Sequence, residues 1–420
     1  MTKFKTTQQV LADLKWVICS PVLIECSTPD VTWVDDQFCR ESWVRCRKKI
    51  ESMEIQDEGL SDYGIEEPSS QKLGAYFEYL IALWFSIDPI YQVLEQNKII
   101  QGETRTLGEL DFLIYDKERK KTIHLEVAVK FYLHGLIARQ GKAALWEWFG
   151  PSLVDRLDKK YAAMQWRQIN LPSRIETTVT VDENWGLLKG RLYHHEPYCE
   201  PYAISAQSLK GTWYTQSEYC EIYQERDALL LDKLQWLIHE KPLDEMAKKI
   251  DLTSPVKEPV MIRRKDETHC FIVPNDWPEN AQKLHEGMRR ELEEHYQNAI
   301  YEVDYQETKY VLYTSELGPE TLPDCCIVTA YNPGKDRPSI VENDRRHNQL
   351  YDMLVGEGFT VFSARGKSVN ELCLHEEASW AVIIKEGAIW QDKIMRLMAL
   401  FGQRAVLIHQ PNQRPLVWWC

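Results

Sequence analysis

The chain has 420 residues, of which 44% are hydrophobic and 11% aromatic, which is enough for two folded domains and too apolar for a disordered protein. Its net charge of −14 argues against a protein that coats nucleic acid nonspecifically, but it leaves room for a local basic groove. No apolar run is long enough to span a bilayer, and the polar start 1–5 lacks the apolar stretch of a signal peptide, so we expect a cytoplasmic protein without a membrane partner.

The first part of the chain combines strongly periodic helices with strand-like runs. The predicted elements are a helix over 6–18, an irregular acidic stretch, an apolar helix over 71–87, and strands over 91–100, 109–115 and 122–131. Asp88 and Pro89 end the second helix, and the charged turn 116–121 joins the last two strands into a hairpin.

A change of composition near residue 300 separates a second region from the first. Before it we predict a helix over 152–169, strands over 175–181 and 185–193, a helix over 226–238, strands over 260–263 and 270–273, and a charged helix over 279–296. After it we predict strands over 310–314, 326–331, 359–363, 380–384 and 405–409, with helices over 342–355 and 390–400. We therefore divide the chain into a domain 1–285, a linker helix 286–300 and a small α/β or α+β domain 301–420.

The predicted hairpin has one apolar face and one face with ionisable side chains. Alternate residues of a strand share a face, so Glu109 and Asp111 point one way, and His124, Glu126 and Lys130 share a face of the next strand. If the turn pairs Tyr115 with Thr122, Asp111 falls opposite Glu126.

Two facing carboxylates repel each other and would destabilise an empty site, so their placement favours a divalent cation between them. Oxygen ligands favour Mg²⁺ or Mn²⁺ over zinc. Lys130, on the face of Glu126, could orient a water molecule or stabilise charge on phosphate oxygens. The alternative is a solvent-facing hairpin with ordinary surface charge, which explains the turn well but explains Glu126 and Lys130 less well, because both lie in an apolar stretch.

These residues resemble the PD-(D/E)XK nuclease superfamily, whose core is a helix with a glutamate followed by a hairpin with Asp and (D/E)-x-Lys. The resemblance implies an α/β, restriction-endonuclease-like mixed sheet flanked by helices. It also implies that Glu78, Asp111, Glu126 and Lys130 are catalytic, with Glu78, Asp111 and Glu126 around the metal. The motif's lysine position, two residues after the second acid, holds Ala128, and Lys130 lies two residues further on the same face.

More narrowly, residues 8–280 resemble an uncharacterised bacterial family placed in that superfamily. The segments that carry this resemblance are 14–16, 20–21, 105–112, 125–132, 150–151, 155–157 and 271–278. From about residue 301 the chain resembles a second uncharacterised bacterial domain, through 329–333, 342–343, Asn348, Leu350, 377–379 and 401–403. The Asn, Glu and Gln side chains there could line a small-ligand or nucleotide pocket, or could serve as turn and capping residues.

Taken together, the patterns predict a metal-dependent nuclease that acts on nucleic acid, with DNA favoured over RNA. Candidate phosphate contacts are Arg105, Arg139, Lys142, Lys159 and Gln165, the last two on a polar helix whose charges would equally suit an exposed surface. The alternatives are a binding protein that keeps the nuclease fold without turnover, and a regulatory protein whose C-terminal domain senses a ligand. The sequence leaves open whether the protein forms a homo-oligomer and whether its C-terminal domain binds a small ligand.

Overall fold

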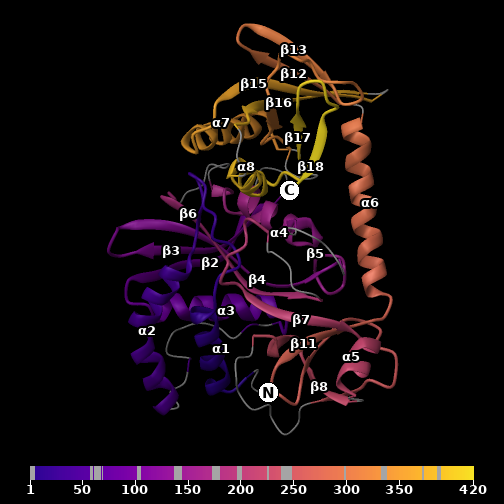
Figure 1. Cartoon of the computed structure of the whole chain (residues 1–420). Helices are drawn as coiled ribbons and strands as arrows, with labels where there is room; N and C mark the ends of the chain where they lie inside the picture. The colour runs from indigo at the N-terminus through magenta and orange to yellow at the C-terminus, as the bar shows by residue number, and fades with distance from the viewer. Residues whose placement is uncertain are drawn as a thin grey trace.

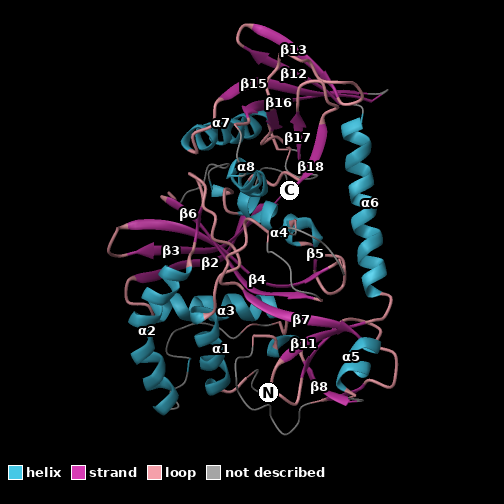
Figure 2. Ribbon diagram, viewed as in Figure 1, coloured by secondary structure: helices cyan, strands magenta, loops and turns pink. Residues whose placement is uncertain are grey.

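The structure is a computed structural model (Figure 1). It describes residues 5–56, 60, 68, 70–101, 106–136, 144–172, 180–195, 201–224, 227–237, 248–297, 299–332, 338–370, 373–385 and 389–420. Two sheets with their helices make up the molecule: a large mixed sheet in the first two-thirds of the chain and a smaller sheet at the C-terminal end (Figure 2).

Helices cover the large sheet, join it to the small one and pack between them. They are α1 (Thr7–Cys19), α2 (Asp36–Gln56), α3 (Leu73–Ile87), α4 (Leu157–Ala163), α5 (Gln216–Tyr223), α6 (Trp277–Gln297), α7 (Ile340–Gly356) and α8 (Ile389–Leu400). One π-helical turn, Met164–Gln168, continues α4. Within the described residues, no helix combines the length and the apolar character needed to cross a membrane.

The large sheet has 11 strands and mixes both pairing directions. Its strands are β1 (Thr32–Trp33), β2 (Tyr91–Gln101), β3 (Thr106–Asp116), β4 (Lys121–His134), β5 (Trp148–Phe149), β6 (Glu183–His194), β7 (Leu209–Thr215), β8 (Asp227–Leu231), β9 (Lys249–Asp251), β10 (Val260–Arg263) and β11 (His269–Val273). The main order is β2-β3-β4-β6-β7-β11-β10-β8-β9. The pairs β4–β6, β6–β7 and β7–β11 are parallel, and the β2-β3-β4 edge is antiparallel.

The small sheet has seven strands, in the order β13-β12-β15-β16-β14-β17-β18. They are β12 (Ala299–Tyr305), β13 (Thr308–Tyr313), β14 (Cys325–Val328), β15 (Val361–Asn370), β16 (Cys373–Ile383), β17 (Ala405–His409) and β18 (Leu416–Trp419). Every pairing among these described strands is antiparallel, so this region is α+β, one of the two classes expected. Helix α6 runs from one sheet to the other along the side of the molecule (Figure 1).

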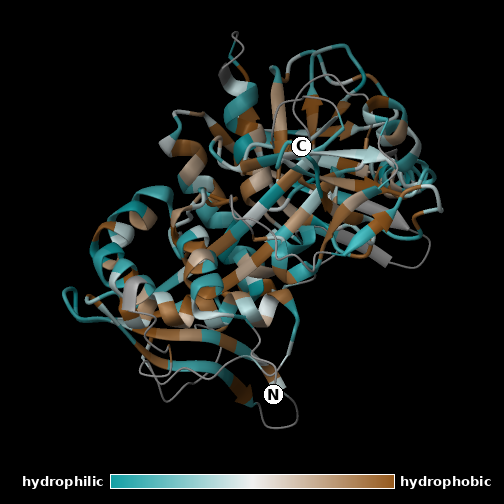
Figure 3. Cartoon of the chain, turned by 90° about the horizontal axis from the view of Figure 1, so that it is seen from below, coloured by the Kyte–Doolittle hydropathy of each residue, from teal (hydrophilic) through white to brown (hydrophobic). Residues whose placement is uncertain are grey.

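The main hydrophobic core lies between the large sheet and the helices α1, α2 and α3, and contains the inward faces of β3 and β4. Helix α3 is almost wholly buried, from Tyr76 to Ile87, because it is apolar on nearly every side. In Figure 3 the strands and the packed helix faces carry the brown hydrophobic segments, and outer helix faces are teal. This packing fixes α3 against the sheet and thereby places Glu78, which α3 carries.

A second core cluster joins the two domains. It contains side chains from β4, β6 and the α4 region together with side chains from α7, α8 and the small sheet. The Tyr161 hydroxyl donates to the Leu400 carbonyl at 3.1 Å, and the Trp166 and Phe401 rings stack at 5.4 Å between centroids. Arg404 Nη2 also donates to Asp158 at 3.0 Å. Helix α4 is therefore held on one side by the C-terminal domain.

Several sequence-based expectations are wrong in detail. Residues 226–238, predicted as a helix, contain β8, because the short apolar run at Leu229–Leu231 pairs with β10. The acidic stretch after α1 contains the long helix α2. The helix predicted over 152–169 begins only at Leu157, because Leu153 has a left-handed φ of 62° and Arg156 is extended. Most of the strand predicted over 175–181 lies outside the described residues.

Candidate active site

The candidate site lies where two strands of the large sheet separate. The predicted pairing of Tyr115 with Thr122 is present, and the ladder between β3 and β4 ends one pair before Asp111 and Glu126. From there β3 stays paired with β2, whereas β4 stays paired with β6. The two carboxylates therefore face each other across the point of separation, as the register predicts.

The alternation of faces along β4 is confirmed. The odd-numbered side chains pack in the main core; they are Ile123, Leu125, Val127 and Val129. On the opposite face, His124 and Glu126 are both 0% exposed. Strand β3 departs from the expected pattern, because Leu110 packs with Leu113 and Leu171 instead of following Phe112 into the main core. Leu110 and Phe112 therefore belong to different hydrophobic clusters, next to the point where β3 separates from β4.

Asp111 and Glu126 replace the missing ladder bonds with their own side chains. The backbone N–H of Val127 donates to Asp111 Oδ2 at 2.9 Å, and the N–H of Asp111 donates to Glu126 Oε1 at 3.4 Å. Burial raises the pKa of the Asp111 carboxyl to about 8, and the negative charges of Glu126 and Glu78 act in the same direction. The site therefore disfavours ionised Asp111 unless positive charge is added.

Glu126 is oriented by its neighbours. Gln168 Nε2 donates to Glu126 Oε2 at 3.1 Å, and His124 Nε2 lies 3.1 Å from Glu126 Oε1. His124 Nδ1 lies 3.0 Å from the Ile169 carbonyl, which can only accept, so Nδ1 carries a proton. Glu126 is thus held by Gln168 at one carboxylate oxygen and by His124 at the other.

Glu78 approaches the same site from α3. Burial raises the pKa of its carboxyl, and Glu109 and Glu126 add to the effect, while a hydrogen bond from the Asn97 side chain opposes it. Asn97 belongs to β2 and has a left-handed φ of 52°, which asparagine tolerates better than most residues. The helix acid and the hairpin acids are therefore close enough to interact electrostatically.

The lysine that interacts with these acids is Lys160, whereas the sequence motif pointed to Lys130. Lys130 Nζ is bound to Asp155 at 2.7 Å. Burial lowers the pKa of Lys160 and the charge of Lys130 adds to this, whereas Asp111 and Glu126 act in the opposite direction. Lys160 Nζ also donates to Gln168 Oε1 at 3.3 Å. Lys160, from α4, thus interacts electrostatically with Asp111 and Glu126.

The π-helical turn after α4 determines which glutamine side chain contacts Glu126. Such turns are rare and are frequently found at functional sites. Gln168, at its end, reaches Glu126, whereas Gln165 is fully buried and binds Trp33 Nε1 at 2.5 Å and Thr28 Oγ1 at 2.9 Å. This burial removes Gln165 from the side chains that can contact a nucleic acid.

Of the other four candidate phosphate contacts, the structure describes only Lys159. Lys159 is exposed on α4, next to Lys160. Arg105, Arg139 and Lys142 lie outside the described residues.

The sequence patterns gave no role to His124, Asn97, Lys160 or Gln168. The only sequence signal for Lys160 and Gln168 is a Lys and a Gln eight residues apart on one helical segment, and this pattern is too common to identify them. In the described residues no group of three or more His, Cys, Asp or Glu side chains is arranged to hold a metal ion. The acids that the site brings together are the adjacent carboxylates of Asp111 and Glu126, with Glu78 near enough to affect the pKa of Asp111.

Comparison with known families gives two matches along the chain. Residues 12–283 match the family described as "Domain of unknown function (DUF1853)". The chain belongs to the DUF1853 family. Residues 328–406 match a second description, "Protein of unknown function (DUF3293)". No curated protein and no solved structure matches the chain.

The expectation of two successive domains of uncharacterised families is thus confirmed, in the expected order. Neither description states an activity. The activity of this DUF1853 protein has to be argued from the geometry of Asp111, Glu126 and their neighbours.

Proposed function

We propose that this DUF1853 protein is a metal-dependent nuclease that hydrolyses phosphodiester bonds in nucleic acid, with DNA favoured over RNA. The observation that carries the proposal is the pair of carboxylates at the separation of β3 and β4, of which Asp111 is half-buried and Glu126 is buried. A helix glutamate, Glu78, and a lysine, Lys160, accompany the pair. This combination is similar to the restriction-endonuclease-like core of the PD-(D/E)XK superfamily.

The donor set fits Mg²⁺ or Mn²⁺. Magnesium is usually bound by one or two carboxylates, with water and substrate phosphate completing its shell, so a two-carboxylate site needs no third protein ligand. The raised pKa of Asp111 supports the same conclusion, because adjacent positive charge would favour its ionised form. When bound, the ion would polarise a phosphoryl oxygen and acidify a water molecule.

The side chains around the pair take separate roles. Asp111 and Glu126 would hold the ion, and Glu78 would assist them from α3. The Lys160 ammonium stabilises the negative charge that develops on the phosphate oxygens. His124 and Gln168 fix the orientation of Glu126, as hydrogen-bond partners of ligating carboxylates commonly do.

One observation favours a second candidate function, a nucleic-acid-binding protein without turnover. Ala128 occupies the lysine position of the motif, and Lys130 is engaged by Asp155. In that case the acids would still bind a metal and a phosphate backbone, but strand cleavage would be absent. Separate measurements of binding and of cleavage distinguish the two functions.

The test uses the purified full-length chain with linear, circular and single-stranded DNA and with structured RNA, in Mg²⁺, Mn²⁺ or EDTA. Asp111→Asn keeps the shape of the side chain and removes its charge. We expect cleavage by the wild type only with a metal, and a loss of at least about 100-fold in the variant, above the ~10–100-fold typical of outer-shell changes. Glu118→Gln, in the exposed turn of the same hairpin, is the matched control and should cleave normally.

Cleavage that is equal in Asp111→Asn and wild type would contradict the proposal. Absence of cleavage on all substrates, with DNA retained by the wild type in a gel-shift assay, would favour the binding protein instead.

A further inference from the structure

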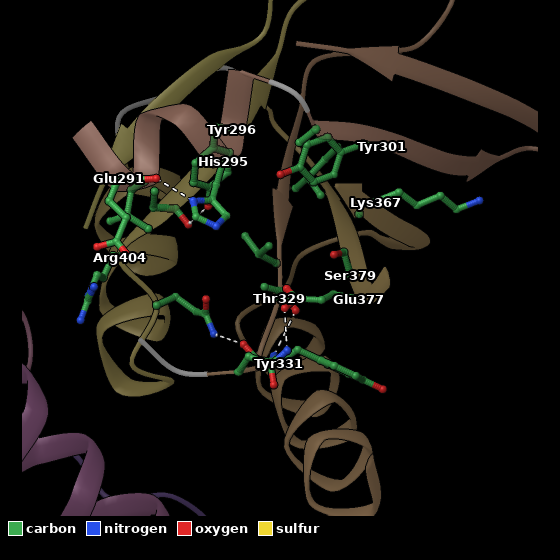
Figure 4. Close-up of a pocket in the computed structure, with 18 residues that line it drawn as sticks. Glu291, His295, Tyr296, Tyr301, Thr329, Tyr331, Lys367, Glu377, Ser379 and Arg404 are labelled. Atoms are coloured by element: carbon green, nitrogen blue, oxygen red, sulfur yellow. Dashed lines mark hydrogen bonds between the residues drawn. The ribbon is translucent and has the colours of Figure 1, made fainter. Parts of the chain in front are cut away.

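The cavity of the C-terminal domain shows how this protein pairs charged side chains outside the candidate active site. It has a volume of about 420 Å³ and lies between the end of α6 and the strands β12, β14, β15 and β16 (Figure 4). On its wall, Glu377 Oε1 accepts from Asn332 Nδ2 at 2.6 Å, and Asn343 Nδ2 donates to Asn332 Oδ1 at 3.1 Å. Lys367 Nζ forms an ion pair with Glu302 at 2.7 Å. Each of these charged groups therefore has a polar or charged partner, as charged groups in proteins usually do.

Lys189, on β6, is a buried lysine that departs from this rule. Alternate residues of a strand share a face, and Leu187 and Tyr193, on the face of Lys189, belong to the main core. Lys189 itself is 0% exposed, and in the part of the chain that the structure describes it forms no ion pair. Its Nζ donates to the Ser20 carbonyl and, at 3.4 Å, to Cys39 Sγ. A core position thus holds an amine whose partners are a carbonyl oxygen and a thiol.

The thiol of Cys39 is as enclosed as the amine. Cys39 lies on α2 and is 3% exposed. Burial raises the pKa of its thiol, whereas the charge of Lys189 and the hydrogen bond from it lower this pKa. A fully buried lysine is rare unless an opposite charge compensates it, because the loss of hydration is costly. The pair is therefore better explained by a reaction that the two side chains perform together than by packing alone.

We propose that Cys39 and Lys189 form an oxidative modification site, in which one oxygen atom from dioxygen joins Sγ to Nζ. The separation of 3.4 Å between the two atoms is a contact distance. A bridge of one atom needs only a small approach of the side chains, whereas a direct sulfur–nitrogen bond would need a larger one. Dioxygen is small and apolar, so burial does not exclude it as it excludes charged oxidants. The inference does not depend on the proposed nuclease activity.

The reaction consumes one molecule of dioxygen and releases one molecule of water. The O–O bond, the S–H bond and one N–H bond break, and the S–O and O–N bonds form. The second oxygen atom leaves as water with the two hydrogen atoms. Sulfur and nitrogen each give up two electrons, which supplies the four electrons that dioxygen takes. The bridged Nζ keeps one hydrogen atom, which can still be donated to the Ser20 carbonyl.

The bridge would fix helix α2 to the strand beside the acid-bearing strand. Cys39 and Lys189 are 150 positions apart in the chain. In the ladder between β4 and β6, Lys189 pairs with Val129, and β4 also carries Glu126. A covalent link over so long a loop stabilises the folded chain, as a disulfide does.

The experiment starts from the full-length chain, reduced with dithiothreitol and transferred to buffer without reductant under argon. One half stays under argon and the other is exposed to air, and the intact mass of each is measured. We expect only the sample in air to gain one oxygen atom and to lose two hydrogen atoms. Trypsin should then leave peptide 16–40 joined to peptide 175–191, uncut after Lys189. The Tm of this sample should rise by about 5 °C, as expected for a long-range cross-link.

Two substitutions remove one partner each. Cys39→Ser and Lys189→Met should both abolish the mass change and the joined peptides. Cys19→Ser is the matched control and should still form the bridge, because Cys19 is an exposed thiol at the end of α1, beside Ser20. If Lys189→Met does not fold, as judged by circular dichroism, Cys39→Ser decides the question, since it replaces only the sulfur atom.

Three results would overturn the proposal. The first is an equal mass in air and under argon. The second is a gain of oxygen without joined peptides, which would indicate a simple oxidised thiol. The third is a loss of two hydrogen atoms that disappears in Cys19→Ser, which would indicate a disulfide between Cys19 and Cys39.

Discussion

The two carboxylate sites of this protein are built on opposite principles. In the large sheet, Asp111 and Glu126 are placed against each other, and burial with like charge raises the pKa of Asp111. In the small sheet, Glu377 stands with the amides of Asn332 and Asn343, which orient it. Crowded acids require added positive charge, whereas amide groups orient a carboxylate without adding a like charge. The difference teaches that one chain can hold two carboxylates by opposite means, against another acid or among amides.

The lysine of the crowded site offers the largest test of this contrast. Lys160→Ala should lower DNA cleavage about 100-fold, the usual cost of removing one charge-stabilising donor, whereas Lys130→Ala should lower it less than about tenfold because Asp155 holds that lysine outside the acid pair. Cleavage rates at saturating Mg²⁺ measure both effects. A larger loss of cleavage in Lys130→Ala than in Lys160→Ala would mean that Lys130, on β4, is the lysine that stabilises the phosphate charge.

The support of Glu126 gives a smaller effect. Gln168→Ala removes the hydrogen bond to Glu126 Oε2 and should weaken the apparent affinity for Mg²⁺ about tenfold, as expected for a partner of a ligating group. A titration of cleavage rate against Mg²⁺ concentration measures this shift, and the maximal rate should change little. Gln165→Ala is unsuitable as a control, because Gln165 is part of the core. An unchanged Mg²⁺ titration would mean that Gln168 has no part in metal binding.

The smallest expected effect concerns stability without metal. Because the pKa of Asp111 rises from an ordinary 3.8 to about 8 on folding, the folded chain keeps a proton that the unfolded chain releases. Its contribution to stability is therefore full below pH 4 and is lost as pH rises toward 8. In EDTA, the Tm of the wild type should fall more between pH 5 and pH 8 than that of Asp111→Asn, by a few degrees. Parallel Tm profiles for the two proteins would argue against a strained carboxylate pair.

The hairpin could be predicted from sequence, because its geometry is local. The charged turn fixes the pairing of Tyr115 with Thr122, and the two-residue period then brings Asp111 opposite Glu126. The resemblance to a known motif added Glu78, which lies in the well-packed helix α3. These features depend on neighbours along the chain or on a strong apolar pattern.

The rest of the site depends on contacts between distant segments. Lys160 and Gln168 reach the acids because α4 and its π-helical turn are held by Tyr161 against Leu400 and by Trp166 against Phe401. These contacts join segments that lie far apart in the chain, so no local sequence pattern predicts them.

The errors in the fold have similar causes. Strand β8 forms through its distant partner β10, and α2 was obscured by its charge although its buried side chains recur at helical spacing. These buried side chains are Cys39, Cys46, Ile50 and Met53.

Helix α4 and its π-helical turn pack against both domains, and this has a consequence for how the two domains evolve. One side of the segment presents Lys160 and Gln168 to the acids, and the other presents Tyr161 and Trp166 to the C-terminal domain. Recombination that exchanged the C-terminal domain for an unrelated one would uncover these rings and release the helix that completes the acid site. We therefore expect the two domains to be inherited as a pair, with compensating changes at Phe401 whenever Trp166 varies.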